Sequence, residues 1–350
     1  MRIGLYGMPT AGKTHVLDRI NFMEVVTGSR LLRELDPDFD KRDETGREHD
    51  REELARLMSQ KDEFIMDGHF AFGNEIAFTE KDGEMYDAIL YLYVAPEILQ
   101  ERILNSEKNH VYAGFDVKEW QKREISGLRE YCHEKNKDFY VLDNPPHNVF
   151  GDVSDIICFI RQITEGYSCA TFAKRCAEDI LEKSGSDTVV LLDGDKTLTM
   201  EDSSNAVFQY RTTIFDGNFY TGFQAWKQSQ EFKEYSFGEL TELPVRLNEK
   251  VRAALPADSF ILTSGHGRVW DFISKNVGID CYYGMEMSAE TKLYVTKFLQ
   301  AEGKRVIAYG DGMNDYYMLM QADEGYLVAK PDGTVSRSLR GKNLEGLIIV

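Results

Sequence analysis

The second half of the chain is interpreted from the stretch Leu191-Leu192-Asp193-Gly194-Asp195-Lys196-Thr197-Leu198-Thr199. Residues 188–192 are apolar and rich in Val and Leu, so they predict a buried strand that ends directly before Asp193. Asp195 follows two positions later and leaves the strand end on the same side. In a parallel α/β sheet, functional side chains are expected just beyond the carboxyl ends of strands, which is where these two acids lie.

Three further motifs follow in order along the chain. Residues 260–263 predict a second strand that leads into Ser264, and Lys292 follows about thirty residues later. Residues 306–309 predict another strand, and the residues after it read Gly310-Asp311-Gly312-Met313-Asn314-Asp315. The four motifs together resemble those of the haloacid dehalogenase superfamily, in the GDGxND form common among its phosphoserine-phosphatase-like members. The resemblance covers residues 187–350.

This resemblance implies a phosphatase that works through a covalent aspartyl-phosphate. Asp193 would attack phosphorus, which divides one difficult displacement into two easier ones. Asp195 would protonate the leaving oxygen and later take a proton from the hydrolytic water. An acid at this second position favours a phosphatase over a dehalogenase. Ser264 would donate to a phosphoryl oxygen, and Lys292 would add positive charge in the transition state.

The resemblance also implies a magnesium site. Two carboxylates beside a phosphate need countercharge, which Mg²⁺ would supply while held by Asp193, Asp311 and the backbone carbonyl of Asp195. Asp315 would complete the outer sphere of the ion.

Some positions in these motifs have more than one interpretation. Thr263 is an alternative to Ser264 as the hydroxyl of the second motif; Ser264 is preferred because a glycine follows it directly. Thr197 is expected to shape its loop, not to react. His266 is expected to be a bystander, with contact to substrate as the alternative. Lys196 stands where the family more commonly has glycine.

About 60 residues, 200–259, separate the first two motifs, which is too many for a turn. This segment resembles an inserted cap of the helical type, which closes over the site and selects the substrate. Within it, residues 215–226 are rich in aromatic side chains. They predict either a small cap core or an aromatic surface for a base or another planar group. A closing cap favours a small phosphate monoester as the substrate.

The N-terminus carries a phosphate-binding motif, Gly7-Met8-Pro9-Thr10-Ala11-Gly12-Lys13-Thr14. It fits GxxxxGK[ST], with an apolar run at residues 2–6 before it and a helical pattern at residues 15–20 after it. Gly7 and Gly12 let the backbone curl so that its N–H groups point at a phosphate. Lys13 would neutralise β- and γ-phosphate charge, and the Thr14 hydroxyl would ligate Mg²⁺. The motif therefore predicts an ATP site.

The remainder of the first half, to about residue 145, resembles the adenylate-kinase-like branch of P-loop kinases. Asp67 directly follows an apolar run at residues 64–66, where such proteins place a second-shell magnesium ligand; a turn-forming role before Gly68 is the alternative. Residues 88–94 and the helical pattern after Pro96 look like the strand and arginine-bearing helix of nucleotide kinases.

That second resemblance implies a phosphate acceptor region between the first two strands and a mobile lid after the Pro96 helix. The candidates for neutralising the transferring phosphate are Arg102, Arg123 and Arg129. The alternative for each is a solvated arginine on a helix face. The presumed acceptor region, residues 36–56, is strongly acidic, so it would favour a small acceptor over a polyanion.

Both halves alternate short apolar runs with longer helical patterns, which predicts two α/β domains, each with a doubly wound parallel sheet. A turn-rich stretch at residues 142–148 and a helical pattern at residues 153–163 close the first domain. We therefore expect a kinase-like domain at residues 1–165 and a phosphatase domain at residues 166–350.

Composition limits the partners of the chain. The net charge is −18, and residues 1–165 hold 21 Lys and Arg against 33 Asp and Glu, while the rest holds 20 against 26. Neither half is basic, which disfavours nonspecific binding to nucleic acid. The five cysteines are scattered without a CxxC pair, and neither a signal-peptide pattern nor a 20-residue apolar run is present. These features predict a cytoplasmic protein with reduced thiols and no membrane partner.

The leading hypothesis from the sequence is a bifunctional enzyme with a kinase head and a phosphatase tail, acting on a nucleotide or another small phosphate monoester. Its main rival resembles polynucleotide 5′-kinase/3′-phosphatases, which repair strand ends and show the same pairing of domains. A third hypothesis makes the N-terminal half an ATP-binding module that regulates the phosphatase.

Overall fold

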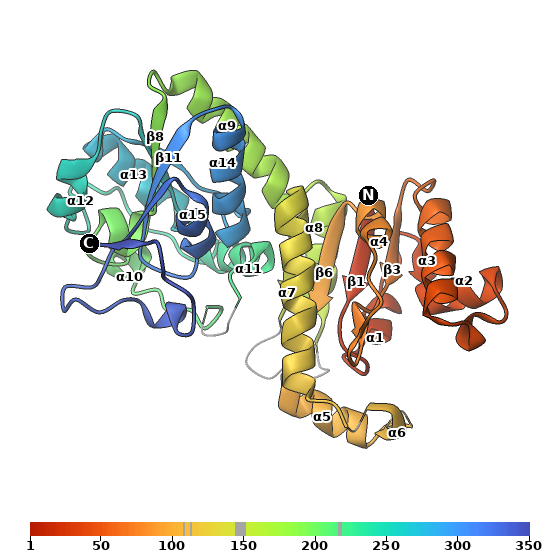
Figure 1. The fold of residues 1–350 in the computed structure, drawn as a ribbon. Coiled ribbons are helices and arrows are strands. Elements are labelled where there is room, and N and C mark those ends of the chain that lie inside the picture. The colour runs from red at the N-terminus through yellow and green to blue at the C-terminus, as the bar shows by residue number, and fades with distance from the viewer. Residues whose placement is uncertain (108, 113, 144–151, 216–218) are drawn as a thin grey trace. The chain divides into compact units, whose positions relative to one another are not determined.

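The computed structural model describes residues 1–107, 109–112, 114–143, 152–215 and 219–350 (Figure 1). The chain forms two compact units, Met1–Tyr167 and Ser168–Val350. Most of the turn expected to end the first domain, residues 144–148, lies outside the described residues. Among the helices described, none is long and apolar enough to span a bilayer.

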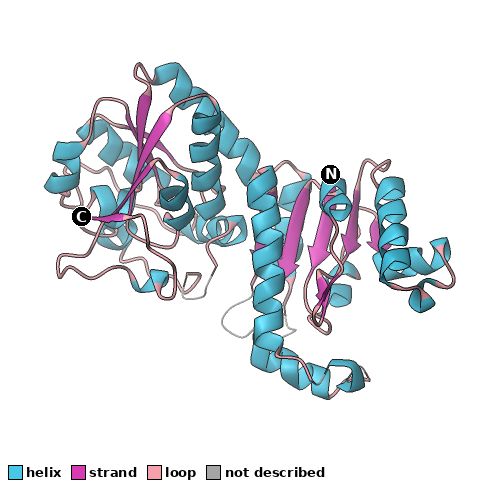
Figure 2. Ribbon diagram, in the orientation of Figure 1, coloured by secondary structure: helices cyan, strands magenta, loops and turns pink. Residues whose placement is uncertain are grey.

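Unit 1 is built on a parallel sheet, as the sequence predicts, and this sheet has five strands (Figure 2). In spatial order its strands are β2 (Val25–Thr27), β3 (Phe64–Asp67), β1 (Arg2–Tyr6), β6 (Ala88–Leu92) and β7 (Asp138–Leu142). A hairpin of β4 (Ala71–Phe72) and β5 (Glu75–Ile76) follows β3. The helices are α1 (Lys13–Leu17), α2 (Gly28–Leu35), α3 (Glu44–Met58), α4 (Glu80–Met85), α5 (Pro96–Leu104), α6 (Asn109–Tyr112), α7 (Val117–Lys135) and α8 (Ser154–Thr164).

Strand β1 lies at the centre of this sheet, between β3 and β6. From β1 the chain passes to β2 and β3 on one side and only later to β6 on the other, so the strand order reverses at β1. Ligands of open α/β sheets bind at such a reversal, outside the carboxyl ends of the strands. The glycine-rich loop after Tyr6 therefore begins at the position where sheets of this kind bind ligands.

Unit 2 contains a six-stranded parallel sheet. Its spatial order is β10 (Asp280–Tyr282), β9 (Ser259–Leu262), β8 (Thr188–Leu192), β11 (Arg305–Gly310), β12 (Glu324–Leu327) and β13 (Ile348–Ile349). Helices α9 (Cys169–Lys183), α14 (Ala289–Ala301) and α15 (Tyr316–Gln321) contribute to one hydrophobic core, and α12 (Glu249–Ala254) and α13 (Gly267–Val277) to another.

The central strand β8 shows why its sequence lacks a polar alternation. Val189 and Leu191 belong to the core with α9 and α14, whereas Val190 and Leu192 belong to the core with α13. Successive side chains of a strand point to opposite faces, so a strand covered on both faces must be apolar throughout. This explains the continuous apolar run that precedes Asp193.

The insertion between β8 and β9 is shorter than expected. Its helices are α10 (Ser203–Phe208) and α11 (Gly222–Phe232), and its neck closes where Thr199 bridges Leu247 in antiparallel fashion. After the neck, Val251 of α12 packs into the core beside β8. The expected cap of residues 200–259 is therefore too long, because residues 248–259 return to the body of the unit to build α12 and enter β9. Residues 216–218 of its aromatic-rich stretch lie outside the described residues.

Candidate functional site

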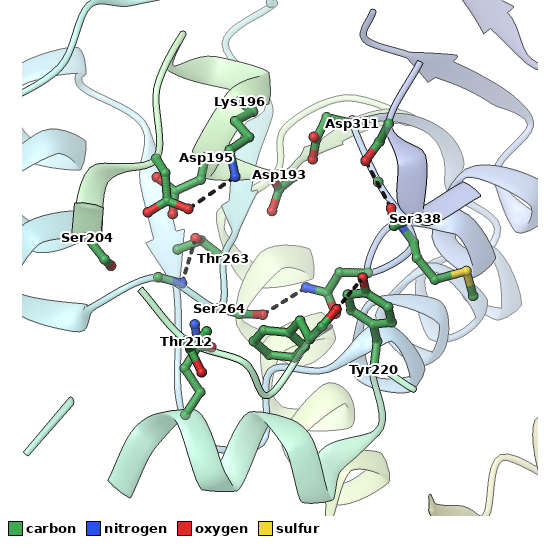
Figure 3. A pocket seen from close by; sticks show the side chains of 18 of the residues that line it. Asp193, Asp195, Lys196, Ser204, Thr212, Tyr220, Thr263, Ser264, Asp311 and Ser338 are labelled. Carbon is green, nitrogen blue, oxygen red and sulfur yellow. Dashed lines mark hydrogen bonds and ion pairs between the residues drawn. The ribbon is translucent and has the colours of Figure 1, made fainter. Parts of the chain in front are cut away.

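Three carboxylates meet at the carboxyl edge of the unit 2 sheet, between β8 and β11. Asp193 follows β8 and Asp311 follows β11, and these two strands are neighbours. The strand order reverses between them, as it does at β1 in unit 1. One carboxylate oxygen from each of Asp193, Asp311 and Asp315 lies within 4.8 Å of the others. They line a cavity of about 570 Å³, where Figure 3 shows Asp193 and Asp311 pointing into the same space.

The side chain of Lys292 forms ion pairs with two of these three carboxylates. Its Nζ lies 2.6 Å from Asp193 Oδ1 and 2.7 Å from Asp315 Oδ1, and its side chain is completely buried. Burial by itself lowers the pKa of Lys292, but the two adjacent carboxylates outweigh it and the pKa is raised. The ammonium group is therefore held charged, as a fixed countercharge behind Asp193.

Asp315 braces the loop that carries Asp311. Its second oxygen, Oδ2, accepts hydrogen bonds from the backbone N–H of Asp311 at 3.1 Å and of Gly312 at 3.2 Å. A Cβ on Gly310 would come within 2.3 Å of Asp315 Cβ, so only glycine fits there. The Gly-Asp-Gly sequence thus lets the loop close around the Asp315 carboxylate.

The site holds more negative charge than Lys292 balances. Burial, and secondly Asp315, raises the pKa of Asp193 well above its usual value, and the same two causes raise the pKa of Asp311 to about 7. An all-oxygen, under-neutralised cluster of this kind fits a hard divalent cation. The chemistry of the donor set therefore agrees with the Mg²⁺ expected from the sequence.

Asp195 stands apart from this cluster. Its Oδ1 accepts a hydrogen bond from the backbone N–H of Ser203 at 2.7 Å, which ties it to the start of α10. Burial, followed by the nearby charge of Asp202, raises the pKa of Asp195 to about 6. Its Oδ2 lies beside Gly265, where a Cβ would approach it to 2.9 Å. Asp195 therefore places Oδ2 beside Gly265 in the lining of the cavity.

The two hydroxyls of the second motif both line the cavity but have different partners. Ser264 Oγ donates to the Met287 carbonyl at 2.7 Å and accepts from Asn314 Nδ2 at 2.8 Å. Thr263 Oγ1 accepts from the Gly265 N–H at 3.0 Å. To donate to a phosphoryl oxygen, Ser264 would have to exchange its bond to Met287, whereas the proton of Thr263 has no acceptor among the described residues. The geometry keeps both hydroxyls as candidates.

Lys196 occupies a backbone conformation that favours glycine, with φ of 62°. This explains why glycine is common at the position, and the left-handed conformation costs a side chain about 1–2 kcal/mol. Its Nζ pairs with Asp202 at 3.1 Å. Thr197 is fully buried beneath the same loop.

His266 is part of an aromatic cluster. Its ring centroid lies 4.9 Å from Phe208, 5.2 Å from Phe232 and 5.7 Å from Phe237, all of which belong to the insertion. Burial, and secondly Arg268, lowers the pKa of His266, so the ring is neutral at pH 7. His266 thus packs the insertion against the body.

In unit 1 the glycine-rich loop turns sharply between β1 and α1. Gly7 has φ of 152° and Gly12 has φ of 100°, and a Cβ on Gly7 would come within 2.9 Å of the Leu92 carbonyl oxygen. Lys13 is buried, and its Nζ donates to the Gly7 carbonyl at 2.5 Å and to the Met8 carbonyl at 3.3 Å. Thr14 is exposed at the first turn of α1. The loop is therefore curled around its lysine.

Of the three arginines proposed for the lid, the structure brings Arg102 to this loop. Its Nη1 lies 3.3 Å from the Thr10 carbonyl oxygen. Arg123 instead donates to the Gly73 carbonyl in the β4–β5 turn, and Arg129 lies 5.5 Å from the ring centroid of Phe139. The difference arises because both of these arginines lie on α7, which packs along β6 and β7, whereas Arg102 lies on α5.

Asp67 accepts a hydrogen bond from the backbone N–H of Gly28 at 2.9 Å, so it links the end of β3 to the start of α2. It lines a cavity of about 480 Å³ in unit 1, beside the carboxyl ends of β1 and β3. Arg47 and Arg51 from α3 line the same cavity. The region expected to be acidic thus contributes two arginines to this lining, together with Asp40.

Sequence reasoning missed a buried glutamate behind the glycine-rich loop. Glu124 is fully buried, and it accepts hydrogen bonds from Tyr91 at 2.8 Å, from Trp120 at 3.1 Å and from the Ala71 N–H at 3.2 Å. Burial raises its pKa, although the charge of Lys13 opposes the shift. No local pattern marks Glu124 in the sequence, because it lies within an otherwise ordinary amphipathic helix.

Comparison with known proteins gives partial likenesses. Residues 6–112, under a third of the chain, match a family model described as an AAA domain. No curated protein matches. A shikimate kinase from Acinetobacter baumannii, solved with shikimate, covers 47% of this chain and 92% of its own at 15% identity and a TM-score of 0.35. A HAD family hydrolase from Salmonella enterica serovar Typhi covers 42% and 64% at 17% identity and a TM-score of 0.28. Structural likenesses at this level say nothing about the activity of this chain.

The buried Lys292 generates a stability prediction. Lys292→Met leaves Asp193 and Asp315 without their countercharge, so we expect the free energy of unfolding at pH 8 to fall by about 3 kcal/mol or more. The loss should be smaller at pH 5, because burial raises the pKa of Asp193 and protonation of this carboxyl removes part of the uncompensated charge. Denaturant unfolding in EDTA measures it. Lys174→Met, at an exposed position on α9, is the control; an equal loss at both pH values would contradict the prediction.

The raised pKa of Asp311, about 7, predicts that Mg²⁺ binding releases protons. Because the cation needs the deprotonated carboxylate, its affinity should fall about tenfold for each unit of pH below 7. Calorimetric titration in buffers of different ionisation enthalpy would count the protons at pH 6 and pH 8. Asp311→Asn should remove most of this linkage, and an affinity that is constant between pH 6 and 8 would rule it out.

Proposed function

We propose that the chain is a bifunctional phosphoryl-transfer enzyme, with an ATP-dependent kinase in unit 1 and a Mg²⁺-dependent phosphomonoester phosphatase in unit 2. The observation that carries the proposal is Asp193, held on one oxygen by a buried lysine and placed beside Asp311 at the reversal of the sheet. A carboxylate so oriented is a nucleophile with one defined attacking atom.

The contact between Lys292 and Asp193 supports the following assignment of atoms in the first step. Asp193 Oδ1 is bound to Lys292, so Oδ2 attacks phosphorus while the bond from phosphorus to the ester oxygen breaks. Asp195 gives its proton to the departing oxygen. Its pKa of about 6 suits transfer in both directions near neutral pH. In the second step Asp195 takes a proton from water, whose oxygen attacks phosphorus and releases phosphate from Asp193.

Asp193, Asp311 and the Asp195 carbonyl would hold Mg²⁺, with Asp315 behind them. The bound cation would offset the charge of the phosphoryl group facing these carboxylates. Lys292 contributes countercharge from the protein itself, in a position where water is excluded and electrostatic effects are strong.

In unit 1, the curled loop with Lys13, Thr14 and Arg102 supports binding and transfer of a nucleotide phosphate. The cavity lined by Asp67 and Arg51 lies next to Tyr6, the residue before the loop, which suits a phosphate acceptor. Burial lowers the pKa of Arg51, although the nearby charges of Asp82 and Glu75 oppose that shift. Its guanidinium lies 5.9 Å from the ring centroid of Phe39 and forms no hydrogen bond or ion pair with another described residue. We therefore propose a small acceptor that carries an anionic group for Arg51 to bind.

Two head-specific variants test the bifunctional proposal. Asp193→Asn should abolish phosphate release, because an amide cannot form the acyl-phosphate, and it should leave ATP binding unchanged. Lys13→Ala should abolish ATP binding and leave phosphate release unchanged. The measurements are phosphate release and transfer of labelled phosphate from ATP, over nucleotides, sugar phosphates, phosphoserine and 3′-phosphorylated oligonucleotides.

Each alternative has its own outcome in this screen. Activity confined to oligonucleotide ends would replace our proposal with end repair. A phosphatase rate that depends on ATP, without any phosphorylated product, would make unit 1 a regulatory module. Phosphate release that survives in Asp193→Asn would exclude this nucleophile.

The lid arginines give a matched comparison in unit 1. Arg102→Ala should lower the kinase turnover number at least about tenfold, because it removes positive charge that contacts the phosphate loop. Arg123→Ala should have a much smaller effect on turnover, since its guanidinium is bound to the β4–β5 turn. Steady-state kinetics with the acceptor found by the screen would separate the two. Equal effects of both variants would refute the distinction.

A further inference from the structure

A second cavity, of about 370 Å³, adjoins the proposed phosphatase site. The two cavities share a wall made by Gln228, Ser264 and Gly265. Their chemistry is opposite. Five aspartates line the first cavity, whereas none of the described residues that line the second is acidic, although the chain has a net charge of −18.

Four aromatic rings and one face of α11 contribute to the lining of the second cavity, which also includes Lys233. Ala225, Gln228, Ser229 and Phe232 recur at the three- and four-residue spacing that places side chains on one face of a helix. Tyr235, His266 and Tyr283 contribute further rings to the lining.

Gln228 is the polar group at the junction of the two cavities. Its side chain is half-buried, it lines both cavities, and its amide has no hydrogen-bond partner among the described residues. A half-buried amide without a partner is available to a ligand, with two donors and an acceptor.

Asp195 gives the direction in which a substrate would extend. Its Oδ2 lies beside Gly265, in the shared wall. In the proposed reaction this oxygen protonates the ester oxygen, so the leaving group is attached next to Gly265. When the phosphoryl group lies among the aspartates of the first cavity, the leaving group extends toward the second cavity.

We propose that the second cavity binds the leaving group of the phosphatase substrate, and that this group carries an uncharged planar ring. The inference rests on the proposed phosphatase function and deepens it. Rings of this class stack on aromatic side chains, and a hydrogen-bonding edge on the ring would pair with Gln228. A nucleobase and a simple benzyl group share the stacking chemistry but differ in that edge and in their distance from phosphorus.

The test compares three phosphate esters on the full chain with Mg²⁺ and without ATP. These are adenosine 5′-monophosphate, benzyl phosphate and ribose 5-phosphate. We expect kcat/KM for the nucleotide to exceed that for ribose 5-phosphate about tenfold or more, mainly through a lower KM. A matching gain for benzyl phosphate would mean that stacking alone suffices, and its absence would mean that the nucleobase edge is also needed. Equal kcat/KM for the nucleotide and ribose 5-phosphate would overturn the inference.

Filling the cavity provides a second test. Ser229→Trp places an indole in the cavity and should bring the ratio between the nucleotide and ribose 5-phosphate close to one. Ser274→Trp on α13 is the matched control, because both serines are half-buried and donate to the carbonyl three residues before them. Gln228→Ala should reduce the nucleotide preference, whereas Gln230→Ala, on the same helix but outside the cavity lining, should preserve it. A preference that persists in Ser229→Trp would refute the proposal.

Acetyl phosphate separates this inference from the phosphatase function. If the wild-type chain hydrolyses acetyl phosphate but shows no preference for a ring, the second cavity is not a leaving-group site. If it hydrolyses no phosphate compound, the phosphatase proposal fails. The cavity is then tested by calorimetric binding of adenosine 5′-monophosphate. Weaker binding in Ser229→Trp than in Ser274→Trp would support a ring site, and equal binding would exclude one.

Discussion

The ion triad of Lys292 with Asp193 and Asp315 is the constraint on which the rest of unit 2 depends. A fully buried ammonium group is stable only with partners, and its two carboxylates come from loops that follow β8 and β11. The triad therefore ties α14 to both loops. The triad also leaves the negative charge of Asp311 unbalanced. A divalent cation would add positive charge there, and a phosphate ester would add negative charge. One interaction thus fixes the position of the proposed nucleophile, Asp193, beside carboxylates that could hold a metal ion.

Glycines make the close approaches around this triad possible. A Cβ on Gly194 would come within 2.3 Å of the Trp270 ring, and a Cβ on Gly265 within 2.2 Å of Trp270 Nε1. Gly310 is constrained in the same way by Asp315. The buried indole of α13 therefore presses against the loops of the first two motifs. The same requirement for close approach appears in unit 1, where Gly7 lies against the Leu92 carbonyl.

The two units share one feature of topology. In each, the order of parallel strands reverses at a central strand, and the loop after that strand carries the candidate binding groups. Unit 1 places a lysine and backbone amides there, which suit a polyanionic phosphate chain. Unit 2 places carboxylates there, which suit a cation and a covalent phosphoryl intermediate. The opposite charge of the two loops is consistent with the different roles that we propose for the two units.

The sequence by itself determined the two parallel-sheet units, the glycine-rich loop and the carboxylates after β8 and β11, because these depend on local patterns of apolar strands and their end residues. It also indicated an insertion, although not its neck at Thr199 and Leu247.

Only the tertiary structure showed that Arg102 reaches the glycine-rich loop while Arg123 does not, and that Glu124 lies behind that loop. Likewise, Phe223 and Trp226 of the aromatic stretch are buried, whereas Phe232 and His266, far apart in sequence, wall the second cavity. Such contacts join distant segments, and no local periodicity encodes which side chains meet across them.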